Sequence, residues 1–203
     1  MPPAATAATT GLSLKGSVKT VTEFFKYSVN NILYQREIYP SETFKAEKAY
    51  GLSLFVTTEP GLAGYLANVL TQIETWLKTG NLQKLVLVIT SQTTGETLER
   101  WVFDLTTDKS IGENDKVDKS EKEVTQEIAA IQRQITASVT FLPLNDEPCA
   151  FDLLVYTDDD IQVPKAWEES DPRLIVNSDE VKLRSFTTKI HKVDAQVSYK
   201  ADS

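Results

Sequence analysis

Apolar residues recur every three or four positions in three segments of the chain, and every second position in several others. The first spacing is typical of an amphipathic helix, and the second is typical of a half-buried strand. We therefore predict helices over residues 17–35, from Pro60 to about residue 79, and from residue 121 to about residue 142.

Individual residues indicate where the first two helices begin and end. Ser17 is the expected N-cap of the first helix. Tyr39-Pro40 is expected to end it, because the residue before a proline is pushed to an extended conformation. Pro60 suits the first turn of the second helix, and Gly80 suits the position just after its last turn.

The third helix has the clearest pattern. Ser120 and Glu123 form an S-x-x-E capping box. Arg133 projects roughly opposite the apolar stripe and Gln134 lies on its flank, so a solvated face and an interface both remain possible there. The stripe consists of Val124, Ile128, Ile131, Ile135, Val139 and Leu142.

Strand patterns occupy much of the remaining chain. Residues 85–89 are continuously apolar, which suits a central strand covered on both faces. A turn at 93–96 leads to a return strand at 98–105, and residues 106–119 read as a polar surface loop. On that return strand, Trp101, Phe103 and Leu105 share one face. Shorter strands are expected at 52–57 and 150–156.

The last strand-rich segment changes parity. Its apolar or β-branched residues fall on even numbers from Phe186 to Ile190 and on odd numbers from Val193 to Tyr199. A strand has period two, so we expect a bulge, a break or a change of face near His191. The elements together predict an α+β fold, with three helices packed on one face of a mainly antiparallel sheet.

Composition narrows the classes of function. The chain has 203 residues, which favours one domain, and its net charge of −8 argues against a nucleic-acid or anionic-membrane partner. Residues 1–10 lack the pattern of a secretory signal and are expected to be a disordered tail. A single cysteine, Cys149, excludes an intrachain disulfide and fits a reducing compartment. We interpret it as apolar packing rather than a reactive thiol.

Residue types that carry chemistry are scarce. His191 is the only histidine, so no Cys/His zinc set is possible. A triad with Asp152 or Asp194 is not excluded by counting, but a packed or surface histidine fits its strand position better. The acidic runs at 158–160 and 168–169 suit a solvated turn rather than a calcium site, and Trp167 is either a binding anchor or local packing.

Several longer strings resemble one known family, the spindle-checkpoint HORMA-domain proteins of the mitotic-arrest-deficient type. The resemblance runs from Leu12 to Tyr199, and residues 1–10 and 106–119 carry none of it. The strings are ILYQREIYPSETF at 32–44, GETLERW at 95–101, RQITASVTFLPL at 133–144, FDLLVYTD at 151–158, VPKAWEES at 163–170 and VKLRSFTTKIHKV at 181–193.

The resemblance implies an adaptor without catalytic residues, cofactor or metal. It implies a HORMA domain over 11–199, with a mobile C-terminal safety belt at 159–199 and a short tail at 200–203. Such proteins have an open and a closed state. They capture a short extended peptide by strand addition, from a kinetochore coiled-coil scaffold or from the activator of the anaphase-promoting complex. Capture of the activator inhibits that ligase and delays anaphase, in the nucleus, at kinetochores and in the cytoplasm.

The resemblance also implies roles for particular residues. Leu12 to Leu14 are expected to form a small competing strand and the handle for a remodelling ATPase with its adaptor. Peptide binding is expected at Phe151, Leu153, Val155, Tyr156 and Trp167. Self-association of open and closed forms is expected at Arg133, Gln134 and Phe141. The conformational switch is expected to involve Leu12, Leu14, Phe186, Ile190, His191, Val193 and Val197.

Two alternatives remain at this point. The chain could be a related HORMA adaptor, of a translesion polymerase or of the meiotic chromosome axis, with the same fold and a different partner. It could also be an enzyme that uses His191.

Overall fold

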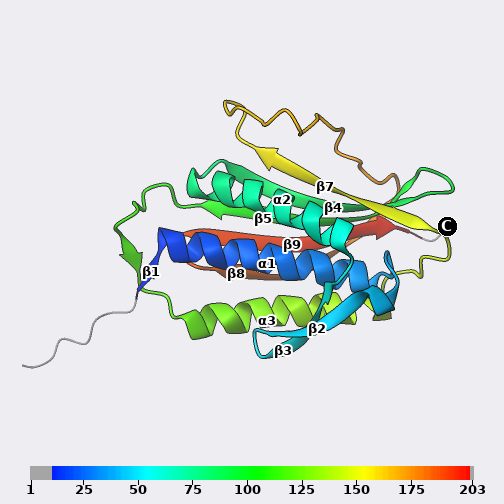
Figure 1. Cartoon of the computed structure of the whole chain (residues 1–203), viewed down its shortest axis with the longest axis horizontal. Helices are drawn as coiled ribbons and strands as arrows, with labels where there is room; N and C mark the ends of the chain where they lie inside the picture. The colour runs from blue at the N-terminus through cyan, green and yellow to red at the C-terminus, as the bar shows by residue number, and fades with distance from the viewer. Residues whose placement is uncertain (1–10, 202–203) are drawn as a thin grey trace, which may run out of the picture.

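Five antiparallel strands form one sheet, and three helices pack on a single face of it (Figure 1). The computed structural model describes residues 11–201 of the chain. The expected tail at 1–10 therefore lies outside the described residues. The strand order is β7-β4-β5-β9-β8, so β7 and β8 are the two edges. The strands are β4 (Leu82–Ser91), β5 (Thr97–Thr107), β7 (Cys149–Thr157), β8 (Ser178–Thr187) and β9 (His191–Lys200).

The predicted central strand is confirmed. Strand β4 pairs with β5 on one side and with β7 on the other, and every side chain from Leu85 to Ile89 is fully buried. Side chains alternate between the faces of a strand, so this run contributes to both faces of the sheet. The alternating Trp101 and Phe103 of β5 lie in the core beneath the helices, as predicted.

Helices α2 (Pro60–Lys78) and α3 (Glu121–Ala137) begin where the sequence predicts. The hydroxyl of Ser120 accepts a hydrogen bond from the backbone N–H of Glu123 at 3.1 Å. Helix α3 ends at Ala137 and a 3₁₀ turn, η2 (Ser138–Thr140), follows, so the predicted apolar stripe stops early. Val139 consequently points to solvent with 45% of its surface exposed.

The first helix ends at Gln35 as predicted, but its predicted start and the residues expected to end it are wrong. Helix α1 spans Leu14–Gln35, and its N-cap is Ser13, whose hydroxyl accepts from the backbone N–H of Gly16 at 3.1 Å. Ser17 lies inside the first turn and is fully buried. The helix also ends before Tyr39-Pro40, because Glu37 adopts a left-handed conformation with φ 54°.

Two small two-stranded sheets complete the fold. Strand β3 (Leu52–Thr57) was predicted, but its partner β2 (Phe44–Ala49) was not, because β2 is largely exposed and has no apolar run. Strand β1 (Leu12–Ser13) pairs with β6 (Lys116–Val117). The predicted loop at 106–119 therefore contains the last residues of β5 and a short strand, and Leu12 lies away from both edges of the five-stranded sheet.

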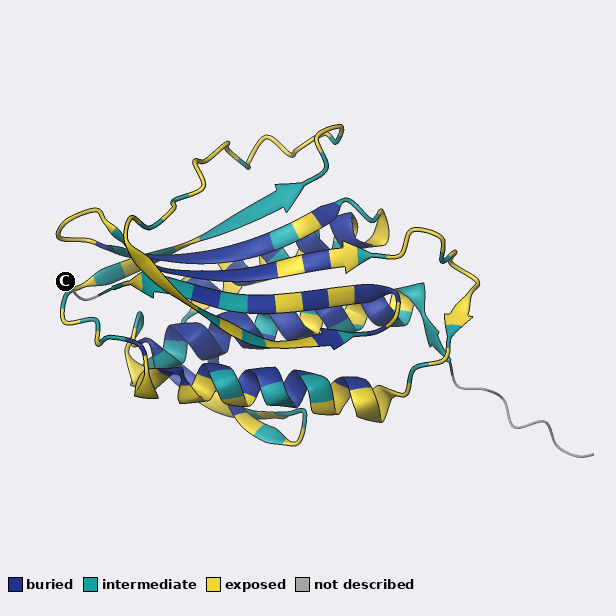
Figure 2. Cartoon of the chain, turned by 180° about the vertical axis from the view of Figure 1, so that it is seen from behind, coloured by how far each residue is buried: buried dark blue, intermediate teal, exposed yellow. Residues whose placement is uncertain are grey.

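The core joins α1 to the C-terminal strands. The ring of Phe24 lies 4.7 Å from the ring of Phe186 on β8 and 5.7 Å from that of Phe103 on β5. Seen from behind, β4 and β5 are buried along most of their length, whereas residues 158–177 are mostly exposed (Figure 2). Within residues 11–201, none of the helices combines the length and apolarity needed to cross a bilayer.

Candidate peptide-binding site

Strand β7 presents one unpaired backbone edge. It is hydrogen-bonded to β4 on one side, from Leu82↔Thr157 to Ser91↔Cys149. Among the described residues, no strand pairs with its other side. Free N–H and C=O groups at a sheet edge are the groups that an added strand requires.

The side chains of β7 are arranged in two rows. Phe151, Leu153 and Val155 pack against the main core on the helix side of the sheet. Leu154 and Tyr156 contact the smaller cluster that lines the opposite face. Four of the predicted peptide-binding residues, Phe151, Leu153, Val155 and Tyr156, thus lie on this edge strand and are half-buried.

Residues 158–177 run beside β7 as an irregular segment (Figure 1). The start of the segment is fixed by Asp158, which accepts from Gln83 at 2.9 Å and from Lys109 at 3.1 Å. These hydrogen bonds lower the pKa of Asp158. Near the other end, Arg100 donates to the carbonyl of Pro172 at 2.9 Å, and Arg173 lies 3.3 Å from Asp152.

Between these two ends, Ile161 and Trp167 pack the segment against the core. Trp167 makes an aromatic contact there. Its ring meets that of Trp76 on α2 edge-on, with centroids 5.2 Å apart. Trp167 is half-buried, so it packs locally while part of its surface stays accessible. No backbone hydrogen bond joins β7 to the segment in the part of the chain that the structure describes.

The C-terminal strands form a hairpin at the sheet edge opposite β7. Strand β9 pairs with β5 at nine positions, from Glu99↔Tyr199 to Thr107↔His191, and β8 pairs with the outer side of β9. The turn at 188–190 explains the parity change, since the chain reverses there. The predicted break near His191 is confirmed.

The predicted switch residues of the hairpin are all buried. Between 0% and 1% of their surface is exposed. Leu12 and Leu14, at the other end of the chain, are half-buried, and Leu14 is the first residue of α1. The buried hairpin residues are Phe186, Ile190, His191, Val193 and Val197.

His191 is a packed histidine. Its Nδ1 lies 2.6 Å from the hydroxyl of Ser17, and burial lowers its pKa to about 4. The two aspartates of the possible triad lie elsewhere: Asp194 is 3.7 Å from Lys192, and Asp152 pairs with Arg173. The hypothesis of a Ser-His-Asp enzyme therefore has no geometric support in residues 11–201.

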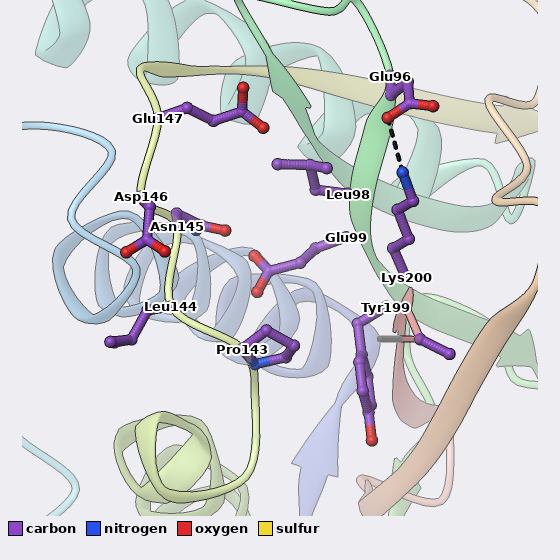
Figure 3. A pocket seen from close by; sticks show the side chains of 11 residues that line it. Glu96, Leu98, Glu99, Pro143, Leu144, Asn145, Asp146, Glu147, Tyr199 and Lys200 are labelled. Carbon is purple, nitrogen blue, oxygen red and sulfur yellow. Dashed lines mark hydrogen bonds and ion pairs between the residues drawn. The ribbon is translucent and has the colours of Figure 1, made fainter. Parts of the chain in front are cut away.

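A polar hollow of about 400 Å³ lies where the end of β9 meets the start of β5 (Figure 3). Glu99 points into it beside Pro143, and Lys200 lies 2.7 Å from Glu96. Glu99 is buried and forms a 2.7 Å ion pair with Arg36 at the end of α1. Burial raises the pKa of Glu99, and the charge of Arg36 opposes that rise. No local sequence pattern indicates this pair, because its members are 63 positions apart in the chain.

The predicted self-association residues lie on α3 and just after it. Arg133 is exposed, and Phe141 has 40% of its surface exposed. Gln134 is half-buried, because its side-chain oxygen accepts from the backbone N–H of Arg184 on β8 at 2.6 Å. Arg133 and Phe141 are thus exposed to a partner, and the partly accessible Gln134 also connects α3 to the hairpin.

Cys149 is half-buried at the start of β7, with its sulfur 3.3 Å from the carbonyl oxygen of Glu147. Burial raises the pKa of its thiol, which lowers the thiolate fraction at neutral pH. This environment agrees with a packing role.

Comparison with known proteins now identifies the class. The model of the HORMA domain family matches residues 17–191, and the chain belongs to that family.

The similarity extends over whole relatives. The mitotic spindle assembly checkpoint protein MAD2A of Dictyostelium discoideum is 58% identical over 197 residues, which cover 97% of each chain. Human MAD2A is 53% identical, over 94% of this chain and 93% of its own. A solved structure of the mitotic checkpoint complex contains a chain that is 45% identical, with a TM-score of 0.85, over 92% of this chain and 99% of its own.

These similarities define a MAD2-type mitotic spindle checkpoint adaptor, not an enzyme. The alternative of a polymerase adaptor is weaker. The DNA polymerase zeta processivity subunit of Schizosaccharomyces pombe is only 28% identical, over 79% of this chain.

Proposed function

We propose that this adaptor captures a short extended peptide of its partners by adding it as a strand to the outer edge of β7. The peptide lies beneath residues 158–177, which close over it. The observation that carries the proposal is the unpaired edge of β7 beside a segment that is fixed at both ends and not hydrogen-bonded to β7.

Backbone hydrogen bonds supply the affinity in this mode of binding, and side-chain pockets supply the specificity. A strand added to β7 continues both rows of its side chains, because successive residues face opposite sides of a sheet. One row of peptide side chains extends the row of Phe151, Leu153 and Val155. The other extends the row of Leu154 and Tyr156 on the opposite face. Trp167 closes over the helix side.

Charge indicates the kind of peptide. Residues 158–177 contain six acidic side chains against two basic ones, and the exposed Asp152 adds a further carboxylate on β7. A peptide with basic and apolar residues at its start and a proline suits this surrounding, since opposite charges steer association. The candidate sources are a kinetochore coiled-coil scaffold and the activator of the anaphase-promoting complex. Capture of the activator inhibits the ligase.

We further propose that the arrangement described above is the closed state. In the open state the β8–β9 hairpin occupies the β7 edge and blocks the peptide. Leaving β5 breaks the pairing at nine positions, and each backbone hydrogen bond contributes about 0.5–1.5 kcal/mol net. Slow interconversion follows, because these bonds break before new ones form.

Further roles follow for the rest of the molecule. Open and closed forms associate through Arg133, Gln134 and Phe141, and a remodelling ATPase with its adaptor acts on the segment from Leu12 to Leu14. Residues 159–199 form the mobile belt, and the protein works in the nucleus, at kinetochores and in the cytoplasm.

Alternate backbone methylation of the peptide tests strand addition directly. In an added strand, every second N–H faces the β7 edge and the others face away. Two peptides of one sequence, N-methylated at odd or at even positions, should differ in affinity by at least tenfold in titration calorimetry. The unmethylated peptide is the reference. Equal loss of affinity in both peptides would argue against binding as a strand.

A further inference from the structure

A buried polar cluster joins the tip of the C-terminal hairpin to helix α1. The hydroxyl of Ser17 lies 2.6 Å from Nδ1 of His191 and 2.6 Å from the hydroxyl of Thr188. All three side chains have 0% of their surface exposed. We call Ser17, Thr188 and His191 the hairpin-tip cluster.

Thr188 organises the turn and reaches the helix at the same time. Its hydroxyl accepts from the backbone N–H of His191 at 2.9 Å and from that of Ile190 at 3.2 Å. Its own backbone N–H donates to the carbonyl of His191 at 2.9 Å. Losing this hydroxyl would leave buried donors without an acceptor, which is costly.

In residues 11–201, the two hydrogen bonds of Ser17 are the only ones between α1 and the hairpin. The other contacts are apolar, such as the packing of Phe24 on Phe186. Apolar packing tolerates more than one geometry, whereas a hydrogen bond needs defined distances and angles. The cluster therefore fixes the position of the hairpin relative to α1.

We propose that Ser17, Thr188 and His191 are positioning residues that hold the hairpin beside β5 and thereby slow the release of a captured peptide. This inference rests on the proposed peptide capture. It adds that helix α1, which is not part of the β7 edge, controls how long the peptide stays bound. If the hairpin moved to the other edge, Ser17 would lose both of its hydrogen-bond partners.

Ser28 provides a matched control for Ser17. It is also a fully buried serine of α1, but its hydroxyl accepts from Gln132 on α3 at 2.9 Å, and among the described residues it forms no hydrogen bond with the hairpin. Ser17→Ala and Ser28→Ala each remove one buried hydroxyl from the same helix. Any difference between them reports on the hairpin and not on general stability.

The test measures peptide release and amide hydrogen exchange in both variants. Ser17→Ala removes both hydrogen bonds of Ser17 and should release the peptide at least tenfold faster than wild type. Ser28→Ala should stay within about twofold of wild type. Equal release rates for the two variants overturn the proposal.

A second pair of variants controls for an effect of the substitution on folding. Thr188→Val removes the hydroxyl with little change in shape and should release the peptide at least as fast as Ser17→Ala, because it also removes the acceptor of two backbone N–H groups. Thr188→Ser keeps the hydroxyl and should release the peptide at nearly the wild-type rate. Faster release from Thr188→Ser than from Thr188→Val contradicts the assignment.

Exchange in the peptide-free protein separates this inference from peptide capture. Amides of β9 that pair with β5 should exchange faster in Ser17→Ala than in Ser28→Ala, even if no peptide binds to β7. Absence of that difference overturns the role of the cluster. Absence of peptide binding in wild type overturns only the proposed capture.

Discussion

Several buried charged and polar groups in this protein are paired across elements that are distant in sequence. Arg36 at the end of α1 donates to Glu99 on β5 and to the carbonyl of Pro143, in the connection between α3 and β7. One guanidinium thus joins three parts of the chain beneath the end of β9. A charge held in this way is costly to leave unpaired.

Replacing Glu99 tests that cost. Glu99→Gln removes the negative partner and leaves the Arg36 charge buried, so it should lower the free energy of unfolding by about 3 kcal/mol in urea titrations. Glu96→Gln, which breaks the exposed pair with Lys200, should cost less than about 1 kcal/mol. A similarly small loss of unfolding free energy in both variants would mean that the Arg36–Glu99 pair contributes little to stability.

The pH dependence of stability reports on His191. Its pKa is about 4 in the folded protein and about 6.5 when unfolded, so the unfolded chain binds more protons between these values. The free energy of unfolding should therefore fall as pH drops from about 6.5 to 4, by up to about 3 kcal/mol. The charged neighbours Lys189 and Lys192 are exposed.

Carboxylates titrate over part of this range, so the wild type must be compared with His191→Gln in the same buffers. The variant should show a shallower decrease between pH 6.5 and 5. Parallel curves for the two proteins would contradict the assignment of this pH dependence to His191.

Single residues were the hardest feature to predict. Ser17 precedes the apolar stripe of the first helix and so has the sequence signature of an N-cap, but Ser13 occupies that position. The first turn of the helix includes Gly16. Glycine is a weak helix former, so the sequence pattern does not indicate a helix at this position. The partners of Ser17 are more than 170 positions away, and no local pattern could indicate them.

At the scale of elements, long periodic segments were predicted well. Helices α2 and α3 and strand β4 have strong spacing and clear boundaries. Strand β2 was missed because only Phe44 of its own residues is buried and it has no apolar run. The edge occupied by the β8–β9 hairpin could not be predicted, since period two gives the faces of a strand and not its neighbour. The residues proposed to bind peptide came from the family resemblance.

Truncating the hairpin tests its role as an element. Deleting residues 194–203 removes six of the nine positions at which β9 pairs with β5. Peptide affinity should fall at least tenfold in titration calorimetry, while the far-ultraviolet circular dichroism of the helices is largely retained. Removal of residues 202 and 203 alone is the control and should leave affinity unchanged. Full affinity in the longer deletion would exclude the hairpin from peptide capture.

Helix α3 offers a test of self-association. Arg133→Ala should weaken association of the two forms by about tenfold in sedimentation velocity, because an exposed arginine on a rigid helix is a strong interface residue. Lys122→Ala, an exposed cation near the start of the same helix, should have no such effect. Identical sedimentation of both variants and wild type would remove Arg133 from the interface.

In the whole molecule, the two edges of the five-stranded sheet differ in role. One edge is completed by the chain's own hairpin, which is tied to α1 and to the core through Phe186 and the hairpin-tip cluster. The other edge, β7, is left unpaired beneath a segment that is fixed at both ends. Peptide release in this arrangement requires opening of that segment, so slow dissociation is expected.

Amide hydrogen exchange of β7, with and without a saturating peptide, tests the central claim most directly. In the free protein, every second amide of β7 faces the unpaired edge and should exchange rapidly, while the amides bonded to β4 are protected. Peptide binding should slow the exchanging set at least a hundredfold and also slow exchange across residues 158–177. Unchanged exchange of those β7 amides, in a protein that demonstrably binds the peptide, would contradict strand addition at this edge.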